Sequence, residues 1–288
     1  MNKILRSVLF TPAERSKALS KSLCLKADAV IMDLEDATSP NNKSTARDNV
    51  YNILNEDVKT KKPSIIVRVN CPFTTPWGKD DLKMLQDINP NNYSAILLPK
   101  CETSEAIDDI VNGYNINSNK TKIWSMIETA VGVIESDKIA SNQHLECLVF
   151  GANDYTKDIK ARHTLSREPL LYSMSKCILS ARAFNKYVID GVHMELGDEE
   201  GLIQSCKQGL CLGFDGKSLI HPNQIEPTNK EFSPTMNEII NAIKIVEAFE
   251  KAESENKGVT VVDDRLIEKL HVEAAEILLQ KAKQMELI

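Results

Sequence analysis

Eight short apolar segments recur over about 220 residues of the chain, and most of them end in a charged side chain or a proline. Runs of this length are too short for helices and are typical of strands buried on both faces of a parallel sheet. The segments are residues 7–12, 29–36, 64–70, 95–100, 123–128, 147–154, 187–192 and 213–222. Stretches with helical spacing separate many of them, at residues 13–26, 43–54, 80–88, 104–111, 168–185 and 199–210. This alternation predicts an α/β fold built around a parallel sheet.

The number of strands favours one of two α/β architectures. Eight strands alternating with helices is the count and the size of a (β/α)₈ TIM barrel. A doubly wound open sheet usually has fewer strands, and its GxGxxG turn is absent after the first strand. We therefore predict a TIM barrel over residues 1–235.

The end of the chain is predicted to be a C-terminal helical extension, residues 236–288. Residues 236–253 have the spacing of an amphipathic helix, and residues 258–264 that of a strand or an extended arm. A last helix is predicted over residues 265–286, with one apolar face formed by Ile267, Leu270, Ala274, Ile277 and Leu278. Because eight strands close without it, the extension is expected to cap the barrel or to reach a neighbouring subunit.

Net charge and cysteine content indicate which macromolecules the protein is not expected to bind and in which cellular compartment it is expected to work. The net charge of −6 argues against nucleic acid and anionic membranes as partners. Seven cysteines without CxxC or zinc-ligand spacing predict free thiols in a reducing compartment. No segment approaches the roughly 20 apolar residues of a membrane span. These features predict a cytoplasmic protein.

Side chains capable of chemistry cluster at the C-terminal ends of the predicted strands. A TIM barrel places its active site at that end of its strands, so we expect these side chains to converge. They are Asp33, Glu35, Arg68, Lys100, Glu128, Asp154, Asp190 and His221.

Glu128 and Asp154 end consecutive strands and are the candidate metal ligands. Two carboxylates form an oxygen-rich site with few protein ligands, which suits Mg²⁺ because this ion keeps several water or substrate oxygens. The alternative is that each acid is a solvated loop residue or a helix N-cap.

Arg68 is the candidate clamp for a substrate carboxylate, because its planar guanidinium can donate two parallel hydrogen bonds. The alternative is a salt bridge to acids of the second strand, where Asp33 and Glu35 are predicted to share one face; the two interpretations are compatible.

His221 could serve as acid, base or ligand, or its side chain could simply form its hydrogen bonds within a loop. Lys17 and Lys21 could form a phosphate patch or a solvated helix face.

Several long motifs in a consistent order resemble the citrate lyase β-subunit-like (HpcH/HpaI aldolase) family. They cover nearly the whole chain: RSVLFTPAER (6–15), DLEDATSPNNKSTAR (33–47), VRVN (67–70) with WGKDDL (77–82), LLPKCE (97–102), MIETAVGV (126–133), GAND (151–154) and GKSLIHPNQI (216–225). The resemblance implies a TIM barrel, often a trimer, that binds Mg²⁺ and a CoA or acyl-carrier thioester.

The resemblance also implies roles for individual residues. Glu128 and Asp154 match the Mg²⁺ ligands, with Glu128 also near the substrate, and Arg68 matches the carboxylate clamp, supported by Asp33 and Glu35. Asp263 matches a catalytic acid that a C-terminal lid offers to the neighbouring subunit; the family usually has glycine at the next position, where this chain has Asp264. The residues expected to contact the CoA moiety or the substrate are Phe10, Lys17, Lys21, Ile220 and His221.

Two functions follow from this resemblance. The first is an Mg²⁺-dependent carbon–carbon lyase that cleaves a 2-hydroxyacyl-CoA-type thioester, such as citramalyl-CoA or malyl-CoA, into a keto acid and acetyl-CoA, or forms the thioester from them. The second is a citrate lyase β subunit that converts citryl-ACP to oxaloacetate and acetyl-ACP within a multi-subunit complex. The extension with Asp263 favours the first. A homotrimer or a higher homo-oligomer is expected.

Overall fold

The computed structural model describes residues 3–56, 63–117, 119–255 and 257–288. These residues form two compact units. One unit is residues 5–230, and the other is residues 231–288 together with the N-terminal residues up to Ile4.

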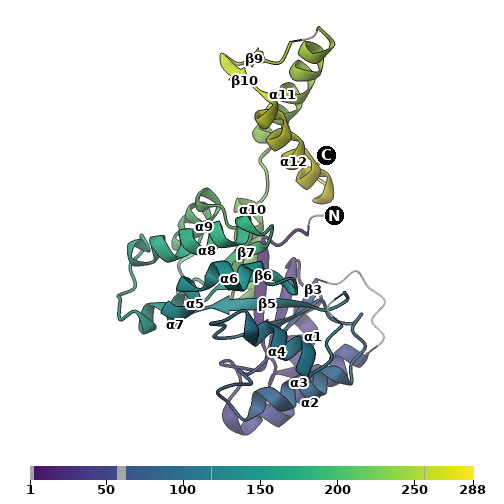
Figure 1. The fold of residues 1–288 in the computed structure, drawn as a ribbon, viewed down its shortest axis with the longest axis vertical. Helices are drawn as coiled ribbons and strands as arrows, with labels where there is room; N and C mark the ends of the chain where they lie inside the picture. Colours follow the sequence, from purple (N-terminus) through teal and green to yellow (C-terminus); the bar gives the residue numbers. More distant parts are fainter. Residues whose placement is uncertain (1–2, 57–62, 118, 256) are drawn as a thin grey trace. The chain divides into compact units, whose positions relative to one another are not determined.

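The larger unit is a closed parallel barrel in which eight strands follow one another in sequence order (Figure 1). This confirms the predicted TIM-barrel fold. Each strand pairs in parallel with its neighbours, and β8 closes the ring against β1. The strands are β1 (Ser7–Pro12), β2 (Ala29–Asp33), β3 (Ser64–Arg68), β4 (Ala95–Leu98), β5 (Lys122–Ile127), β6 (Leu145–Phe150), β7 (Tyr187–Asp190) and β8 (Gly216–Leu219).

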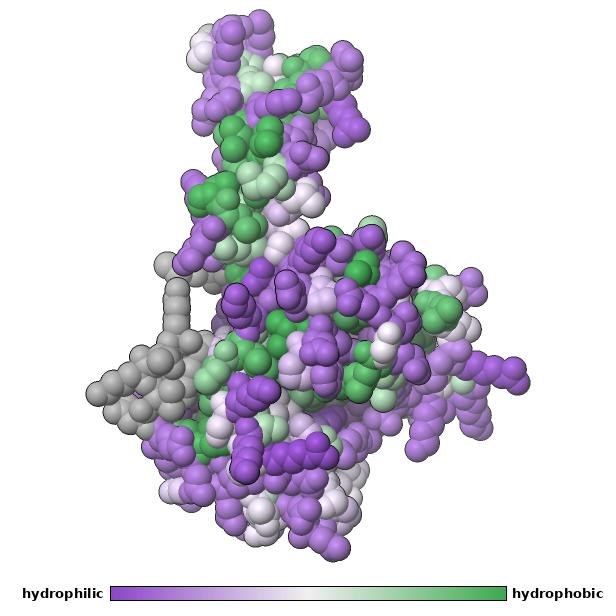
Figure 2. Space-filling view, turned by 180° about the vertical axis from the view of Figure 1, so that it is seen from behind, coloured by the Kyte–Doolittle hydropathy of each residue, from purple (hydrophilic) through white to green (hydrophobic). Residues whose placement is uncertain are grey.

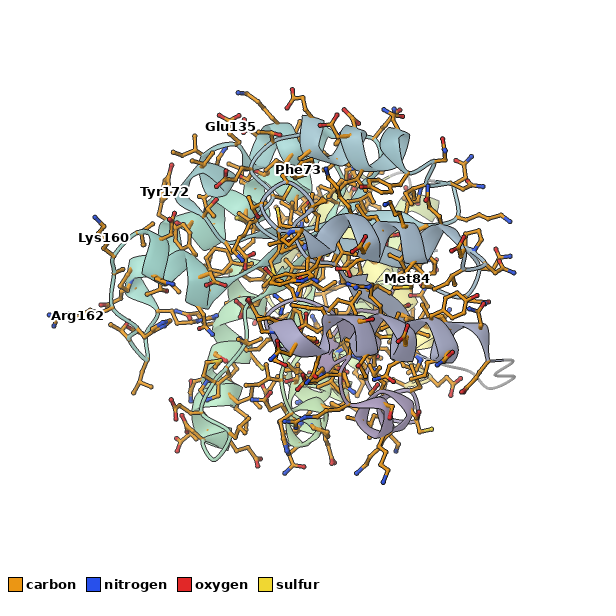
Figure 3. The ribbon with its side chains drawn as sticks, turned by 90° about the horizontal axis from the view of Figure 1, so that it is seen from below. Phe73, Met84, Glu135, Lys160, Arg162 and Tyr172 are labelled. Carbon is orange, nitrogen blue, oxygen red and sulfur yellow. The ribbon has the colours of Figure 1, made fainter. Side chains whose placement is uncertain are left out.

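Helices connect the strands and lie outside the barrel (Figure 3). They are α1 (Ser16–Ser22), α2 (Lys43–Asn55), α3 (Trp77–Gln86), α4 (Glu105–Gly113), α5 (Ala130–Ile134), α6 (Ser136–Ser141), α7 (Ala152–Asp158), α8 (Leu171–Ala183), α9 (Glu199–Leu212) and α10 (Ile225–Glu231). Short 3₁₀ turns lie at Pro40–Asn42, Glu168–Leu170 and Pro222–Gln224. The sequence does not reveal α5, α6 and α7, because helices of five to seven residues are too short to show a period of 3.6.

The interior of the barrel is an apolar core below a polar rim. Alternate residues of successive strands point inward and pack into one cluster, which includes Val8, Ile31, Ile66, Leu97 and Trp124. The parallel register then places charged residues side by side at the C-terminal ends. Asp33 is the direct partner of Arg68, and Asp190 that of Lys217.

The smaller unit is a helical hairpin that carries a two-stranded sheet. Thr235 caps helix α11 (Met236–Ser254), accepting from the Glu238 N–H while the Glu238 carboxylate accepts from the Thr235 N–H. Antiparallel strands β9 (Thr260–Val262) and β10 (Arg265–Ile267) precede helix α12 (Lys269–Gln284). The predicted single arm is therefore a β-hairpin, and the predicted helical start at residue 265 is wrong.

Of the residues predicted to form the apolar face of the last helix, Ile267 lies in β10 and the others lie in α12. The residues of α12 that are buried are Val272, Ala275 and Ala282, whereas Leu270 and Ile277 are 61% and 51% exposed. Apolar side chains are visible on the surface of this unit (Figure 2). Helix α12 thus has more apolar surface than its own unit covers.

The structure also bears on the predictions about the cysteines and about membrane-spanning segments. The seven cysteines are free thiols, as predicted, with Cys24 and Cys211 exposed and the others buried. Among the described residues, none of the helices combines the length and the apolar character needed to cross a membrane.

Candidate active site

Arg68, at the end of β3, is the centre of a buried charge cluster. It donates from Nε to Asp33 Oδ1 at 2.7 Å and from Nη2 to Asp33 Oδ2 at 2.6 Å, and its Nη1 lies 2.8 Å from Glu35 Oε2. Burial alone would lower the pKa of Arg68, but the charges of Asp33 and Glu35 outweigh burial and raise that pKa. The guanidinium is therefore charged and fixed in orientation, as a carboxylate clamp must be.

Glu35 reaches Arg68 by a different route from the one that strand alternation predicts. Strand β2 ends at Asp33, so Glu35 lies in the turn that follows and not on a strand face. Lys43 shapes this turn by donating from Nζ to the carbonyl oxygens of Leu34 and Glu35, at 2.7 Å each. Both acids therefore meet the guanidinium, but the turn, not the strand, places Glu35.

Phe10 lies against the same guanidinium. Its ring centroid is 4.9 Å from the Arg68 Cζ atom, a distance at which the face of an aromatic ring attracts a cation. Phe10 is therefore positioned to stabilise Arg68 while it lines the adjoining cavity.

Lys100 links the Arg68 cluster to Glu128. Its backbone is left-handed, with φ of 48°, and in this conformation the Lys100 N–H donates to Glu128 Oε1 at 2.8 Å. Its Nζ donates to Glu35 Oε1, also at 2.8 Å. A non-glycine residue in this region of φ carries strain that the surrounding contacts must offset. Lys100 thus orients the Glu128 carboxylate.

Glu128 is a buried carboxyl with one unsatisfied oxygen. The side chain is 1% exposed, and among the described residues its Oε2 has no hydrogen-bond partner. Burial, reinforced by the nearby charge of Glu35, raises the pKa of Glu128 to about 8. Because Oε1 accepts the Lys100 N–H, only Oε2 lacks a partner in the described part of the chain. A buried polar oxygen without a partner is costly, so Oε2 is suited to a cation that enters the cavity.

Gly151, which follows β6, leaves the space that this carboxyl occupies. A Cβ at position 151 would lie 2.5 Å from Glu128 Cβ and 2.8 Å from Glu128 Oε2. The Gly151 N–H donates to the Ile127 carbonyl at 2.9 Å, which extends the pairing of β5 with β6 up to the site. Glycine is therefore required here by close approach.

Arg68, Glu128 and Asp154 line one cavity of about 330 Å³ at this end of the barrel. Phe10, Asp33, Met126, Met194, Ser218 and Ile220 also line it. The predicted metal acids and the predicted clamp therefore face the same space, which can hold a small organic acid.

The donor set of this cavity fits Mg²⁺. Within the described residues, no cluster of three or more His, Cys, Asp or Glu side chains could hold a metal. Glu128 and Asp154 would therefore supply two carboxylates and leave the other positions to water or substrate oxygens, the coordination that Mg²⁺ prefers. The unsatisfied Glu128 oxygen, in the space that Gly151 leaves open, is the observation that supports this fit.

Asp190, although it ends a strand, belongs to a separate buried cluster. Arg167 Nη1 donates to both Asp190 oxygens at 2.8 and 2.7 Å, and Lys217 Nζ donates to Oδ2 at 2.9 Å. Burial would raise the pKa of Asp190, but Lys217 and Arg167 lower it overall. Its oxygens are engaged, so Asp190 joins β7 to β8 and to the loop before α8.

The predicted contacts with the CoA moiety lie in different surroundings. Lys17 and Lys21 are exposed on α1, the helix that follows β1. His221 Nδ1 accepts the Asn223 N–H at 3.2 Å and caps a 3₁₀ turn. Ile220 lines the cavity, and His221 is the next residue.

Asp263 lies in the other compact unit, at the turn between β9 and β10. The φ angles of Asp263 and Asp264 are 45° and 60°, as in a two-residue hairpin turn of the primed type. The Asp263 side chain is 66% exposed and lies 3.4 Å from Lys244 Nζ. Its role therefore stays a prediction.

Sequence reasoning placed Lys100 among the side chains expected to converge but gave it no specific role, and it did not single out Lys43 or Gly151. The LLPKCE and GAND motifs contain two of them, but their function depends on a left-handed backbone and on a close approach between strands. A one-dimensional pattern records neither.

The fold and the site together define a (β/α)₈-barrel protein with a carboxylate-rich site at the C-terminal ends of its strands. The chain belongs to the HpcH/HpaI aldolase/citrate lyase family, which residues 6–222 match. This bears out the resemblance in the sequence motifs.

Relatives of the chain carry more than one functional name. It is 38% identical to a (3S)-malyl-CoA thioesterase of Cereibacter sphaeroides, over 96% of this chain and 94% of that one. It is 30% identical to a citrate lyase subunit beta of Haemophilus influenzae, over 98% of each.

Solved structures of CitE from Mycobacterium tuberculosis have the same fold. One, in complex with magnesium, acetoacetate and coenzyme A, has a TM-score of 0.80 at 24% identity, over 96% of this chain and 98% of that one. Another, with magnesium and pyruvate, has a TM-score of 0.69 at 26% identity, over 80% and 91%.

Proposed function

We propose that this protein is an Mg²⁺-dependent lyase that cleaves, or forms, a carbon–carbon bond in a CoA thioester such as malyl-CoA or citramalyl-CoA. The observation that carries the proposal is the unsatisfied Glu128 oxygen in a cavity that Arg68 and Asp154 also line. A substrate with a hydroxyl next to a carboxylate would meet both a cation site and a carboxylate clamp in this space.

Glu128 and Asp154 would hold the magnesium ion. When bound, Mg²⁺ supplies a Lewis acid that lowers the pKa of a coordinated hydroxyl group. The magnesium and pyruvate in the CitE structure support a magnesium-dependent reaction of a 2-oxo acid, since pyruvate is one.

Arg68 would bind the substrate carboxylate and align the bond that breaks. Its donation to Asp33 and its pairing with Glu35 fix the guanidinium before substrate arrives, which lowers the ordering cost of binding. The carbon that carries the hydroxyl is thereby held next to Glu128.

The chemical step balances with one base. The hydroxyl proton goes to a carboxylate, the C–O bond becomes a carbonyl, and the carbon–carbon electron pair leaves as the thioester enolate. Protonation of that enolate at carbon gives the acetyl thioester, and the oxo acid is the second product. Because Asp33 and Glu35 are engaged with Arg68, we assign the base to Asp263, offered by the hairpin of a neighbouring subunit in a homotrimer or a higher homo-oligomer.

The thioester carrier would extend past the cavity mouth. Phe10 and Ile220 line the cavity, while Lys17, Lys21 and His221 are the proposed contacts for the CoA moiety. The citrate lyase β-subunit name of one relative favours an acyl-carrier thioester within a larger complex as the alternative carrier.

Hydrolysis of the same thioester is the second candidate function. It is favoured by the name of the 38%-identical relatives, (3S)-malyl-CoA thioesterase. Cleavage and hydrolysis differ in products, because cleavage yields an oxo acid and acetyl-CoA, whereas hydrolysis yields a hydroxy acid and free CoA.

A panel of CoA thioesters that includes (3S)-malyl-CoA and citramalyl-CoA tests both functions. Oxo acid, acetyl-CoA and free CoA are measured by chromatography with Mg²⁺ and with EDTA. The wild type is expected to release oxo acid only with Mg²⁺, and Glu128→Gln is expected to release none. Turnover that EDTA leaves intact would contradict the metal site.

A further inference from the structure

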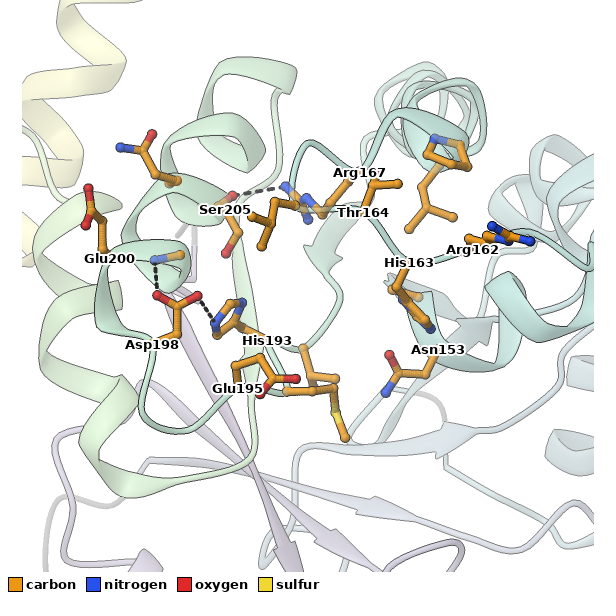
Figure 4. A pocket seen from close by; sticks show the side chains of 18 residues that line it. Asn153, Arg162, His163, Thr164, Arg167, His193, Glu195, Asp198, Glu200 and Ser205 are labelled. Carbon is orange, nitrogen blue, oxygen red and sulfur yellow. Dashed lines mark hydrogen bonds and ion pairs between the residues drawn. The ribbon is translucent and has the colours of Figure 1, made fainter.

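A second cavity, larger than the first, lies beside the site. Its volume is about 630 Å³, and the loops after β6 and β7 line it (Figure 4). Ala152, Asn153, Val192 and Met194 line both cavities. The two cavities are therefore neighbours that share these four residues.

His193 lines the second cavity, and its two neighbours in the sequence line the first. Val192 and Met194 line the Arg68 cavity, and His193 lies with Glu195 and Asp198 along the wall of the second cavity (Figure 4). The ring is largely buried, with 13% of the side chain exposed. An imidazole in this position adjoins the substrate-sized space without belonging to the proposed metal site.

Asp198 holds one side of the His193 ring. His193 Nε2 is buried and lies 3.5 Å from Asp198 Oδ2, with no closer hydrogen-bond partner among the described residues. A distance of this kind is long for a hydrogen bond, but bonds between catalytic groups are often long until a ligand binds. Because Nε2 is the ring nitrogen next to Asp198, we assign the role of proton acceptor to Nδ1.

Other contacts fix both members of the pair. Asp198 caps α9, accepting from the Gly201 N–H at 2.9 Å. Gln224 Nε2 donates to the His193 carbonyl at 2.9 Å, and Gln224 Oε1 accepts the N–H groups of Ile220 and His221. The same side chain thus anchors the His193 loop to the segment assigned to CoA.

We propose that His193, oriented by Asp198, is the general base that activates water for hydrolysis of the thioester. The proposal rests on the proposed function, because it requires an acyl-CoA bound at Arg68. The thioester carbonyl is the far end of a short substrate whose carboxylate is at Arg68, so it is the part of the substrate that can approach the second cavity.

The step balances without a further reactant. Water gives a proton to His193 Nδ1 while its oxygen bonds to the thioester carbonyl carbon. The oxyanion so formed collapses, the C–S bond breaks with its electron pair on sulfur, and the imidazolium returns the proton to the CoA thiolate. The products are the hydroxy acid and CoA.

The experiment measures the ratio of free CoA to acetyl-CoA released from (3S)-malyl-CoA. His193→Ala is expected to lower this ratio by about 100-fold, the lower range for loss of a general base. The matched control is His163→Ala, which removes another histidine from the same cavity wall and is expected to leave the ratio unchanged. His193→Gln, which keeps a polar side chain of similar size, should lower the ratio as well.

Chemical rescue separates a base from a structural histidine. Added imidazole can enter the space that His193→Ala leaves, so it should restore release of free CoA by tenfold or more, and it should not affect wild type. Asp198→Asn keeps the helix cap but removes the charge, so it should lower the rate of hydrolysis without raising KM.

The outcomes are distinguishable. If His193→Ala keeps the wild-type ratio, or if imidazole fails to restore hydrolysis in a variant that still binds Mg²⁺ by calorimetry, His193 is not the base. A wild type that cleaves the carbon–carbon bond but releases no free CoA overturns this assignment alone. A wild type that does neither overturns the proposed function and the assignment with it.

Discussion

At the scale of single residues, the site depends on small side chains and on backbone conformation as much as on its charged groups. Glu128 sits against Gly151, and Lys100 presents its N–H to Glu128 only because its backbone is left-handed. Residues that touch no ligand therefore determine where the carboxylate points, as outer contacts of a metal site commonly do.

Gly151→Ala is expected to weaken Mg²⁺ binding by about 10- to 100-fold, the usual cost of disturbing the groups that orient a metal ligand. The new methyl group would meet Glu128 at 2.5–2.8 Å and would force the carboxyl to move. Isothermal calorimetry measures the effect. Gly113→Ala is the control, because a Cβ there meets nothing within 4 Å. Wild-type affinity in Gly151→Ala would show that Glu128 does not bind the ion.

Arg68→Lys is expected to lower kcat/KM by a factor that corresponds to about 2–3 kcal/mol. Lysine keeps the charge but cannot make two parallel bonds to one carboxylate. Steady-state kinetics on the reactive thioester provides the measurement. Arg6→Lys breaks a comparable pair, with Asp28, just before β1 and should leave kcat/KM unchanged. A loss below about tenfold at position 68 would make Arg68 a structural partner of Asp33 and Glu35 without a role in binding substrate.

At the scale of elements, the parallel register of the strands brings together the charged residues of the two buried ion pairs. Strand pairing itself brings each acid next to its cationic partner. In the register of the barrel, Asp33 lies opposite Arg68 and Asp190 lies opposite Lys217. The first pair borders the cavity and is available for chemistry. The second is fully buried and holds β7 to β8.

Asp190→Asn is expected to lower the free energy of unfolding by about 3–5 kcal/mol, because Lys217 and Arg167 would lose a buried counter-charge. Urea denaturation measures this, with Glu135→Gln as a control that breaks an exposed pair with Lys138 and should leave the free energy of unfolding nearly unchanged. If Asp190→Asn lowers the free energy of unfolding by only about 1 kcal/mol or less, the buried pairs of Asp190 do not stabilise the barrel as proposed.

The same variant gives a pH prediction. The pKa of Asp190 is lowered in the folded protein, so its stabilising contribution is complete above the unfolded-state pKa of about 3.9 and is lost as pH falls through the folded-state value. The stability difference between wild type and Asp190→Asn should therefore be constant near neutrality and shrink below about pH 4. Denaturation series at several pH values would show it.

At the scale of the whole molecule, the chain combines a barrel with a separate unit whose helix α12 exposes Leu270 and Ile277. Exposed apolar side chains on a helix favour contact with another surface. The unit also carries Asp263 at a hairpin turn, which is a rigid way to present one carboxylate. An active site shared between subunits, as proposed above, would use both features.

Mixed oligomers test the shared site. Asp263→Ala and Arg68→Ala subunits should each be inactive alone, and co-refolded mixtures should regain part of the activity, because some interfaces pair an intact Arg68 with an intact Asp263. Activity is assayed after mass spectrometry has verified subunit exchange. Mixtures that stay as inactive as the two parents would show that Asp263 does not act across an interface.

The sequence alone determined the barrel and most of the charged rim. Eight apolar runs followed by polar residues predict eight parallel strands, and strand ends of a barrel meet by geometry, so Arg68 and Glu128 could be placed at one site without coordinates. Asp154 lines the same cavity, but it lies in α7 and not at the end of a strand as predicted. The order of the motifs was enough to indicate the family.

Only the tertiary structure decided how these groups are held. Glu35 reaches Arg68 through a turn that Lys43 shapes, Asp190 is bonded by Arg167 from a distant loop, and His193 lies beside Asp198 within the single loop that follows β7. These contacts depend on where turns and loops lie in space, and loop conformation is not periodic, so no spacing in the sequence records it. The packing of α12 is a further case, because a helix with apolar residues on several sides does not reveal which of them its own unit will bury and which will stay exposed.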